Sequence, residues 1–146
     1  MKNESWKVYW NDYAVDTYIY GSEIFFHSKE DVEFKNNMMS PGTVIKKWHS
    51  KTNYQSDRIE PSLPMIDGEG KYHIKLNVSD ESKDKLMLRL VFYDRYDYEV
   101  GDFVVRNIED DFKCPIQTFS YDVQLINSGA NHFHFRNIII TELIDE

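Results

Sequence analysis

Two histidines near the C-terminal end have the spacing of half a metal site. His132 and His134 lie two residues apart in a segment of alternating polarity, and side chains two apart on a β-strand point to the same side. Zinc would need a third protein ligand from elsewhere. His27, His49 and His73 are the remaining histidines, and no spacing brings one of them here. We therefore predict two surface histidines, with no metal and no cofactor.

Paired carboxylates are the next residues that could do chemistry. Asp94 with Asp97, or Asp110 with Asp111, could act as an acid and base pair or supply oxygen ligands to calcium. In an acidic chain such pairs also arise in turns, where aspartate bonds its own backbone. We assign them to turns and to solubility, and leave a structural calcium ion open.

A catalytic centre has little support in this sequence. Cys114 is the single cysteine, and it precedes Pro115 in an irregular segment that has no nucleophile motif. The sequence contains no glycine-rich phosphate loop, no Gly-x-Ser-x-Gly elbow and no His-Glu-x-x-His helix. We therefore predict that the protein is not an enzyme, and that Cys114 is unreactive.

Aromatic and planar polar side chains remain as candidates for binding a ligand. Such groups stack on the C–H faces of sugars and also bind polypeptides. The candidate ligand-binding residues are Trp48, Tyr54, Arg58, Arg89, Tyr93 and Arg95. For Trp48 and Tyr54 the alternative is a loop anchor in the core, and for Arg89 it is a half-exposed face that keeps the charge in water.

The strand that must position several of these residues is predicted at 86–93. Its leucines and Phe92 alternate with Met87, Arg89, Val91 and Tyr93, so one face belongs to the core and the other is mixed. Further strands are predicted around 5–10, 18–27, 31–35, 43–48, 71–78, 100–105 and 119–125, and in the segment that follows 127–131. The segment 109–115 interrupts the strand pattern, and 49–64 is the longest irregular segment.

The last strand requires an irregularity. Phe133 and Phe135 share one parity, whereas Ile138 and Ile140 share the other. All four can face the core only if one extra residue is inserted near 136–137, which predicts a β-bulge there. With no sustained helical period, we predict an all-β protein: a single antiparallel, jelly-roll-like β-sandwich over 1–146, with about eight to ten strands.

The charge and composition limit the possible partners and compartments. The formal net charge of -8 argues against nucleic acid, because phosphate backbones are bound by lysine and arginine. One cysteine forms no internal disulfide, which suits a reducing compartment. Neither a signal peptide nor an apolar stretch of the roughly 20 residues that span a bilayer is present, so we expect a soluble protein without an integral membrane segment.

The order of several short motifs resembles a known family. The motifs are Tyr20-Gly-Ser22, Met39-Ser-Pro-Gly42, Trp48, Asn53-Tyr54, Arg58, Leu63-Pro64, Phe92-Tyr-Asp94 and Leu125-Ile-Asn-Ser-Gly129. In this order they resemble accessory secretory protein three, the small subunit of the Asp complex in the accessory Sec system of Gram-positive bacteria. The resemblance runs from about residue 18 to about residue 142.

The resemblance implies a function in protein export. It implies a cytoplasmic protein, alternatively peripheral at the inner face of the cell membrane, that works with the two larger Asp-complex subunits and the accessory Sec motor ATPase. Their cargo is a serine-rich repeat adhesin preprotein, which could be held through its glycans. The resemblance also implies a β-sandwich like that of a carbohydrate-binding module. An independent carbohydrate-binding module is the alternative function.

Overall fold

The fold is an antiparallel β-sandwich with ten strands among the described residues. The structure is a computed structural model, and it describes residues 5–10, 17–50, 63–64, 66, 68–79, 82, 84–105 and 107–143. The strands are β1 (Ser5–Val8), β2 (Glu23–Ser28), β3 (Asp31–Lys35), β4 (Val44–His49), β5 (Lys71–Val78), β6 (Leu86–Tyr93), β7 (Glu99–Val104), β8 (Glu109–Lys113), β9 (Ser120–Asn127) and β10 (His132–Glu142).

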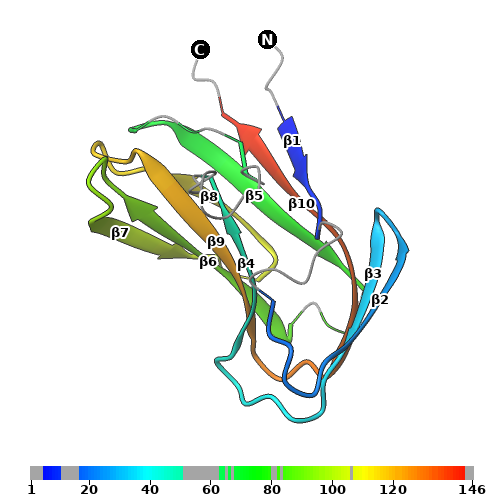
Figure 1. Ribbon diagram of the computed structural model, residues 1–146. Coiled ribbons are helices and arrows are strands. Elements are labelled where there is room, and N and C mark those ends of the chain that lie inside the picture. Colours follow the sequence, from blue (N-terminus) through cyan, green and yellow to red (C-terminus); the bar gives the residue numbers. More distant parts are fainter. Residues whose placement is uncertain are drawn as a thin grey trace, which may run out of the picture.

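The strands form two sheets that pack face to face (Figure 1). The first sheet has the order β2-β3-β10-β5-β8, and β1 pairs with β10 beside this path. The second sheet has the order β4-β9-β6-β7. Every pairing between named strands is antiparallel, so the predicted fold class is confirmed.

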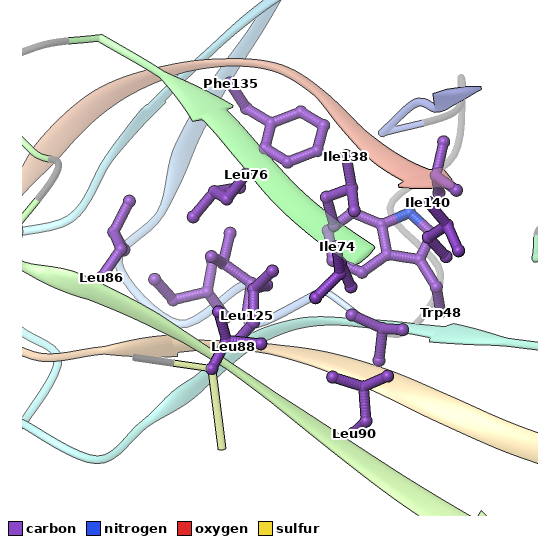
Figure 2. Close-up of a cluster of buried hydrophobic side chains, with 14 of the residues drawn as sticks. Trp48, Ile74, Leu76, Leu86, Leu88, Leu90, Leu125, Phe135, Ile138 and Ile140 are labelled. Atoms are coloured by element: carbon purple, nitrogen blue, oxygen red, sulfur yellow. The ribbon is translucent and has the colours of Figure 1, made fainter. Parts of the chain in front are cut away.

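The core lies between the sheets and is built by alternating residues (Figure 2). The predicted inward face of β6 is buried from Leu86 to Phe92, and it meets Tyr121, Val123 and Leu125 of β9 in register. The first sheet contributes Ile74 and Leu76 from β5 and the apolar residues of β10. Trp48 of β4 lies among them.

The predicted β-bulge is confirmed in β10. The register with β5 shifts between Phe135 and Asn137, so Arg136 is the extra residue. Phe133 and Phe135 before it, and Ile138 and Ile140 after it, are all fully buried. The inserted residue therefore resolves the parity conflict that the sequence shows.

Two strand predictions need correction. The segment 109–115 was expected to lie outside the strands, but Glu109–Lys113 forms β8 at the edge of the first sheet, where only Phe112 reaches the core. An edge strand with one inward apolar residue gives almost no alternation to detect. Phe119 was expected to begin a strand, but it precedes β9 and is exposed.

Candidate functional site

The outer face of the second sheet carries a row of polar side chains. His49 of β4 lies opposite Asp122 of β9, and Asp122 lies opposite Val91 of β6. In the next row Lys47, Gln124 and Arg89 lie side by side in the same way. Asp122, Gln124 and Arg89 have the parity opposite to the core residues of β9 and β6. The cross-strand pairing places His49 and Lys47 beside them, so these side chains share one face.

Hydrogen bonds join the four strands of this sheet on the outer face. His49 Nδ1 lies 2.6 Å from Asp122 Oδ1, and the Tyr93 hydroxyl donates to Asp122 Oδ2 at 3.0 Å. Arg89 Nε donates to Asp102 Oδ2 on β7 at 3.0 Å. We call His49, Arg89, Tyr93, Asp102 and Asp122 the sheet-face network.

Burial and charge hold Tyr93 in its neutral form. Burial is the largest cause and the neighbouring charge of Asp122 the second, and together they raise the pKa of Tyr93 from 10.0 to about 12. Tyr93 therefore remains a hydrogen-bond donor at physiological pH. A face of fixed donors and acceptors beside an aromatic ring can bind sugar hydroxyls or peptide groups.

A groove rich in aromatic and apolar side chains lies at the end of this sheet. Asp94, Arg95, Tyr96, Ile116, Gln117, Thr118 and Phe119 line it. Tyr96, Ile116 and Phe119 are all more than half exposed. We call the site lined by these seven residues the aromatic groove.

Backbone contacts hold both walls of the aromatic groove. Asp94 Oδ1 accepts hydrogen bonds from the backbone N–H groups of Tyr96 and Tyr98, which fixes the turn between β6 and β7. Phe119 N donates to Tyr93 O at 2.7 Å and so joins the other wall to β6. At Gly68 an added Cβ would lie 2.4 Å from the Ile116 carbonyl oxygen, so only glycine fits behind this wall.

The structure brings together half of the six candidate ligand-binding residues. Arg89 and Tyr93 lie in the sheet-face network, and Arg95 lines the aromatic groove that follows Tyr93 along the chain. Tyr54 and Arg58 lie outside the described residues.

Trp48 lies apart from this surface because it is fully buried. Its ring lies edge-on to Trp10, with 6.2 Å between centroids, and stacks on Phe135 at 5.5 Å. Its Nε1 donates to Tyr9 O at 2.9 Å. Trp48 therefore has the place of a core residue, which is the alternative that the sequence left open for it.

Nine residues of this surface were not singled out from the sequence as ligand-binding candidates: His49, Asp94, Tyr96, Asp102, Ile116, Gln117, Thr118, Phe119 and Asp122. The parity of Asp122 against Tyr121 and Val123 is the signal that could have placed it on the outer face. Ile116 and Phe119 lie in an irregular segment, where no periodicity indicates which residues are exposed.

The first sheet brings the predicted histidine pair to a carboxylate. His132 and His134 share the outer face, as predicted, and their ring centroids lie 5.5 Å apart. Glu33 of β3 lies opposite His134, and Glu33 Oε2 is 2.6 Å from His132 Nε2. Hydrogen bonds from His27 and then His132 are the main causes that lower the pKa of Glu33 from 4.5 to about 2.

The other side chains considered for chemistry have structural partners. Asp111 Oδ1 lies 2.6 Å from His73 Nδ1 on the first sheet. Cys114 is buried in the core, whereas His49 lies on an outer face, so this thiol and this imidazole do not form a catalytic pair. Within the described part of the chain, no helix is long and apolar enough to cross a membrane.

Sequence comparison finds similar proteins over most of the chain. A family model described as Accessory Sec secretory system ASP3 matches residues 17–142. An accessory Sec system protein of this type from Streptococcus gordonii is 38% identical over 130 residues, which cover 89% of this chain and 82% of that protein.

Solved structures show the same fold. A chain in the crystal structure of accessory secretory proteins 1, 2 and 3 from Streptococcus pneumoniae matches with a TM-score of 0.88 and 25% identity, over 94% of this chain and 96% of that chain. A chain of the Glycosylation Associate Protein (Gap123) complex from Streptococcus agalactiae also gives a TM-score of 0.88, at 30% identity, over 97% of this chain but only 46% of that one.

A more distant likeness concerns the fold alone. The CBM22-1–GH10 modules of xylanase 10B from Clostridium thermocellum match with a TM-score of 0.54 and 13% identity, over 99% of this chain and 28% of that chain. This agrees with the expected likeness to a carbohydrate-binding module.

Proposed function

This chain belongs to the ASP3 family of the accessory Sec secretory system, and from that premise we propose that it is a non-catalytic binding subunit of the export machinery. It holds the larger Asp-complex subunits on one surface and the serine-rich repeat adhesin preprotein on another. The observation that carries this proposal is the match, along almost its full length, to a chain in the crystal structure of accessory secretory proteins 1, 2 and 3.

The larger subunits dock on the edge of the first sheet at β2. Among the strands of the described residues, β2 pairs with β3 alone, and an open edge offers unpaired backbone groups to a partner. Phe25 and Phe26 on the strand are partly exposed, and Ile19 and Tyr20 before it are more so. Exposed apolar groups on a strand edge are typical of interaction surfaces. We call these four residues the β2 edge.

The preprotein binds at the aromatic groove and the adjoining sheet-face network. Tyr96 and Phe119 offer rings for stacking on sugars or apolar side chains, and Arg95 offers planar donors. Arg89 and Tyr93 extend the surface with donors already held in place by Asp102 and Asp122. Trp48 supports this surface from the core, while Tyr54 and Arg58 remain predicted members of the site.

The accessory Sec motor ATPase and the inner face of the cell membrane complete the proposed setting. The chain would reach both through the assembled complex, as a cytoplasmic protein. Its formal charge of -8 opposes direct contact with an anionic membrane surface.

Adhesin export tests the proposal. A strain that lacks this chain should export little adhesin, and the wild-type chain should restore export. The double variant Tyr96→Ala with Phe119→Ala should restore it poorly, because two stacking rings are lost from the groove. Tyr98→Ala is the matched control, since Tyr98 is equally exposed on the same turn but does not line the groove. Normal export by the deletion strain would overturn the proposal.

Direct glycan recognition by a free-standing module is the second candidate function. The fold likeness and the exposed aromatic groove favour it. Titration calorimetry with N-acetylglucosamine and glucose oligomers separates the two functions. Two results together would favour the independent module. The wild-type chain would give heat of binding that the Tyr96→Ala variant loses, and the wild-type chain would not associate with the larger subunits.

A further inference from the structure

Three of the five histidines gather around one carboxylate on the outer face of the first sheet. Glu33 lies on β3, His27 on the edge strand β2, and His132 and His134 on β10. The pairing of β3 with β10 places Glu33 opposite His134. A register shift between Phe26 and Ser28 on β2 leaves His27 beside the same carboxylate.

The ligand atoms of this cluster converge on a small volume. One ligand atom from each of Glu33, His132 and His134 lies within 4.8 Å of the other two. Glu33 Oε2 is 2.6 Å from His132 Nε2 and 3.9 Å from His134 Nε2. His27 Nε2 lies 2.8 Å from Glu33 Oε1.

These separations fit a tetrahedral zinc ion. Zinc bonds to imidazole nitrogen and carboxylate oxygen are about 2.0–2.2 Å long, so two ligand atoms of a tetrahedral site lie about 3.3 Å apart. The two Glu33–histidine distances of 2.6 and 3.9 Å fall on either side of that value. Movement of the ligand atoms by less than about 1 Å would bring both distances to about 3.3 Å.

Asp31 holds His134 in the form that binds a metal. Asp31 Oδ1 lies 2.7 Å from His134 Nδ1. Because a carboxylate only accepts hydrogen bonds, Nδ1 carries the hydrogen and Nε2 keeps its lone pair when the ring is neutral. That lone pair faces the Glu33 carboxylate, which is also an acceptor. A cation between them relieves this opposition, and a carboxylate behind a histidine ligand is the usual support in zinc sites.

We propose that Glu33, His132 and His134 form a zinc site that is independent of the proposed export function. His27 lies next to the fourth position, which it or a water molecule fills. The two imidazoles select zinc over magnesium and calcium, which prefer oxygen ligands. Lys35 Nζ lies 3.6 Å from Glu33 Oε2. Its positive charge repels a metal cation, so this side chain must turn away when zinc binds.

Zinc binding to the tag-free chain tests this site. The protein is treated with a chelator, gel-filtered, titrated with zinc against a chromophoric competitor, and analysed for metal content. We expect one zinc ion per chain, and a Tm that rises with zinc concentration because the metal binds only the folded site. His132→Ala and His134→Ala should each weaken binding by more than about 100-fold, and Asp31→Asn by about 10–100-fold.

His73→Ala provides the matched control. His73 lies on the outer face of the same sheet and also has carboxylate neighbours, Asp111 at 2.6 Å and Glu109 at 3.4 Å. This variant should bind zinc as the wild type does. A Glu33→Gln variant removes the carboxylate ligand. If it fails to fold, the variants of His132 and His134, two partly exposed residues on β10, still decide whether zinc binds here. A wild-type chain that takes up no zinc in the titration, or equal losses in His73→Ala and His132→Ala, would overturn the proposal.

Discussion

Trp48 and Tyr93 belong to the same sheet but to opposite faces, so their substitutions should have different effects. Trp48 lies opposite Val123 in the core, whereas Tyr93 lies opposite Ser120 and bonds Asp122 on the outer face. Both were candidates for the same binding surface. Only the pairing of β9 with both β4 and β6 shows that one supports the fold and the other faces outward.

Trp48→Ala should lower the free energy of unfolding by about 3–5 kcal/mol, because a fully buried ring leaves a cavity that the core cannot fill. Urea unfolding followed by circular dichroism measures the change. Tyr96→Ala, at a side chain that is 73% exposed, should stay within about 0.5 kcal/mol of the wild type. A similar small effect at Trp48 would contradict its place in the core.

Tyr93→Phe should flatten the alkaline limb of the stability profile. The pKa of Tyr93 is 10.0 when unfolded and about 12 when folded, so the folded state holds more protons between these values. Its contribution to stability is therefore complete below pH 10 and is lost as the pH rises toward 12. Thermal unfolding across this range compares the variant with the wild type. Parallel profiles would argue against the raised pKa of Tyr93, and so against its burial beside Asp122.

The residue patterns predicted which face of a strand a side chain lies on better than which residues it contacts. The two-residue spacing of His132 and His134 correctly placed both on one outer face. The sequence did not identify Glu33 as their neighbour, because that contact depends on the register between β3 and β10. Cross-strand register joins residues about 100 positions apart in the chain, and no local pattern records it.

The bulge in β10 is an element-scale feature that deletion can test. Removing Arg136 would give the two phenylalanines before it and the two isoleucines after it the same parity, so all four could face the core in a regular strand without a bulge. We therefore expect the deletion variant to keep this core and to unfold cooperatively. Arg136→Ala should change little, since the side chain is exposed. Calorimetry of both proteins makes the comparison, and a deletion variant without a cooperative transition would contradict this account of the bulge.

Strands with a continuous apolar face were predictable, and those at an edge were not. The alternation of β5 and β6 gave their bounds within a residue or two. The edge strand β8 was missed because Phe112 is its only buried residue: Glu109 and Asp111 face away from the core, and the inward position before Phe112 is an aspartate. Central β9 is buried along its whole length. Its polar residues Asp122 and Gln124 are therefore covered by neighbouring side chains on the outer face and are not exposed to solvent.

At the scale of the whole molecule, the fold class followed from composition and alternation, and the family from the order of short motifs. Neither source located the binding surfaces. The aromatic groove is made by two segments, 94–96 and 116–119, which the pairing of β6 with β9 brings together. The organisation of 1–146 as a single domain remains a prediction.

Association with the larger subunits tests the central claim most directly. The purified chain is mixed with the two larger Asp-complex subunits from the same organism, and the mass of the eluting species is measured by size-exclusion chromatography with light scattering. We predict that the wild type and Phe119→Asp co-elute with them, whereas Phe26→Asp, which places a charge on the β2 edge, elutes alone. A wild-type chain that elutes apart from both larger subunits would contradict the account.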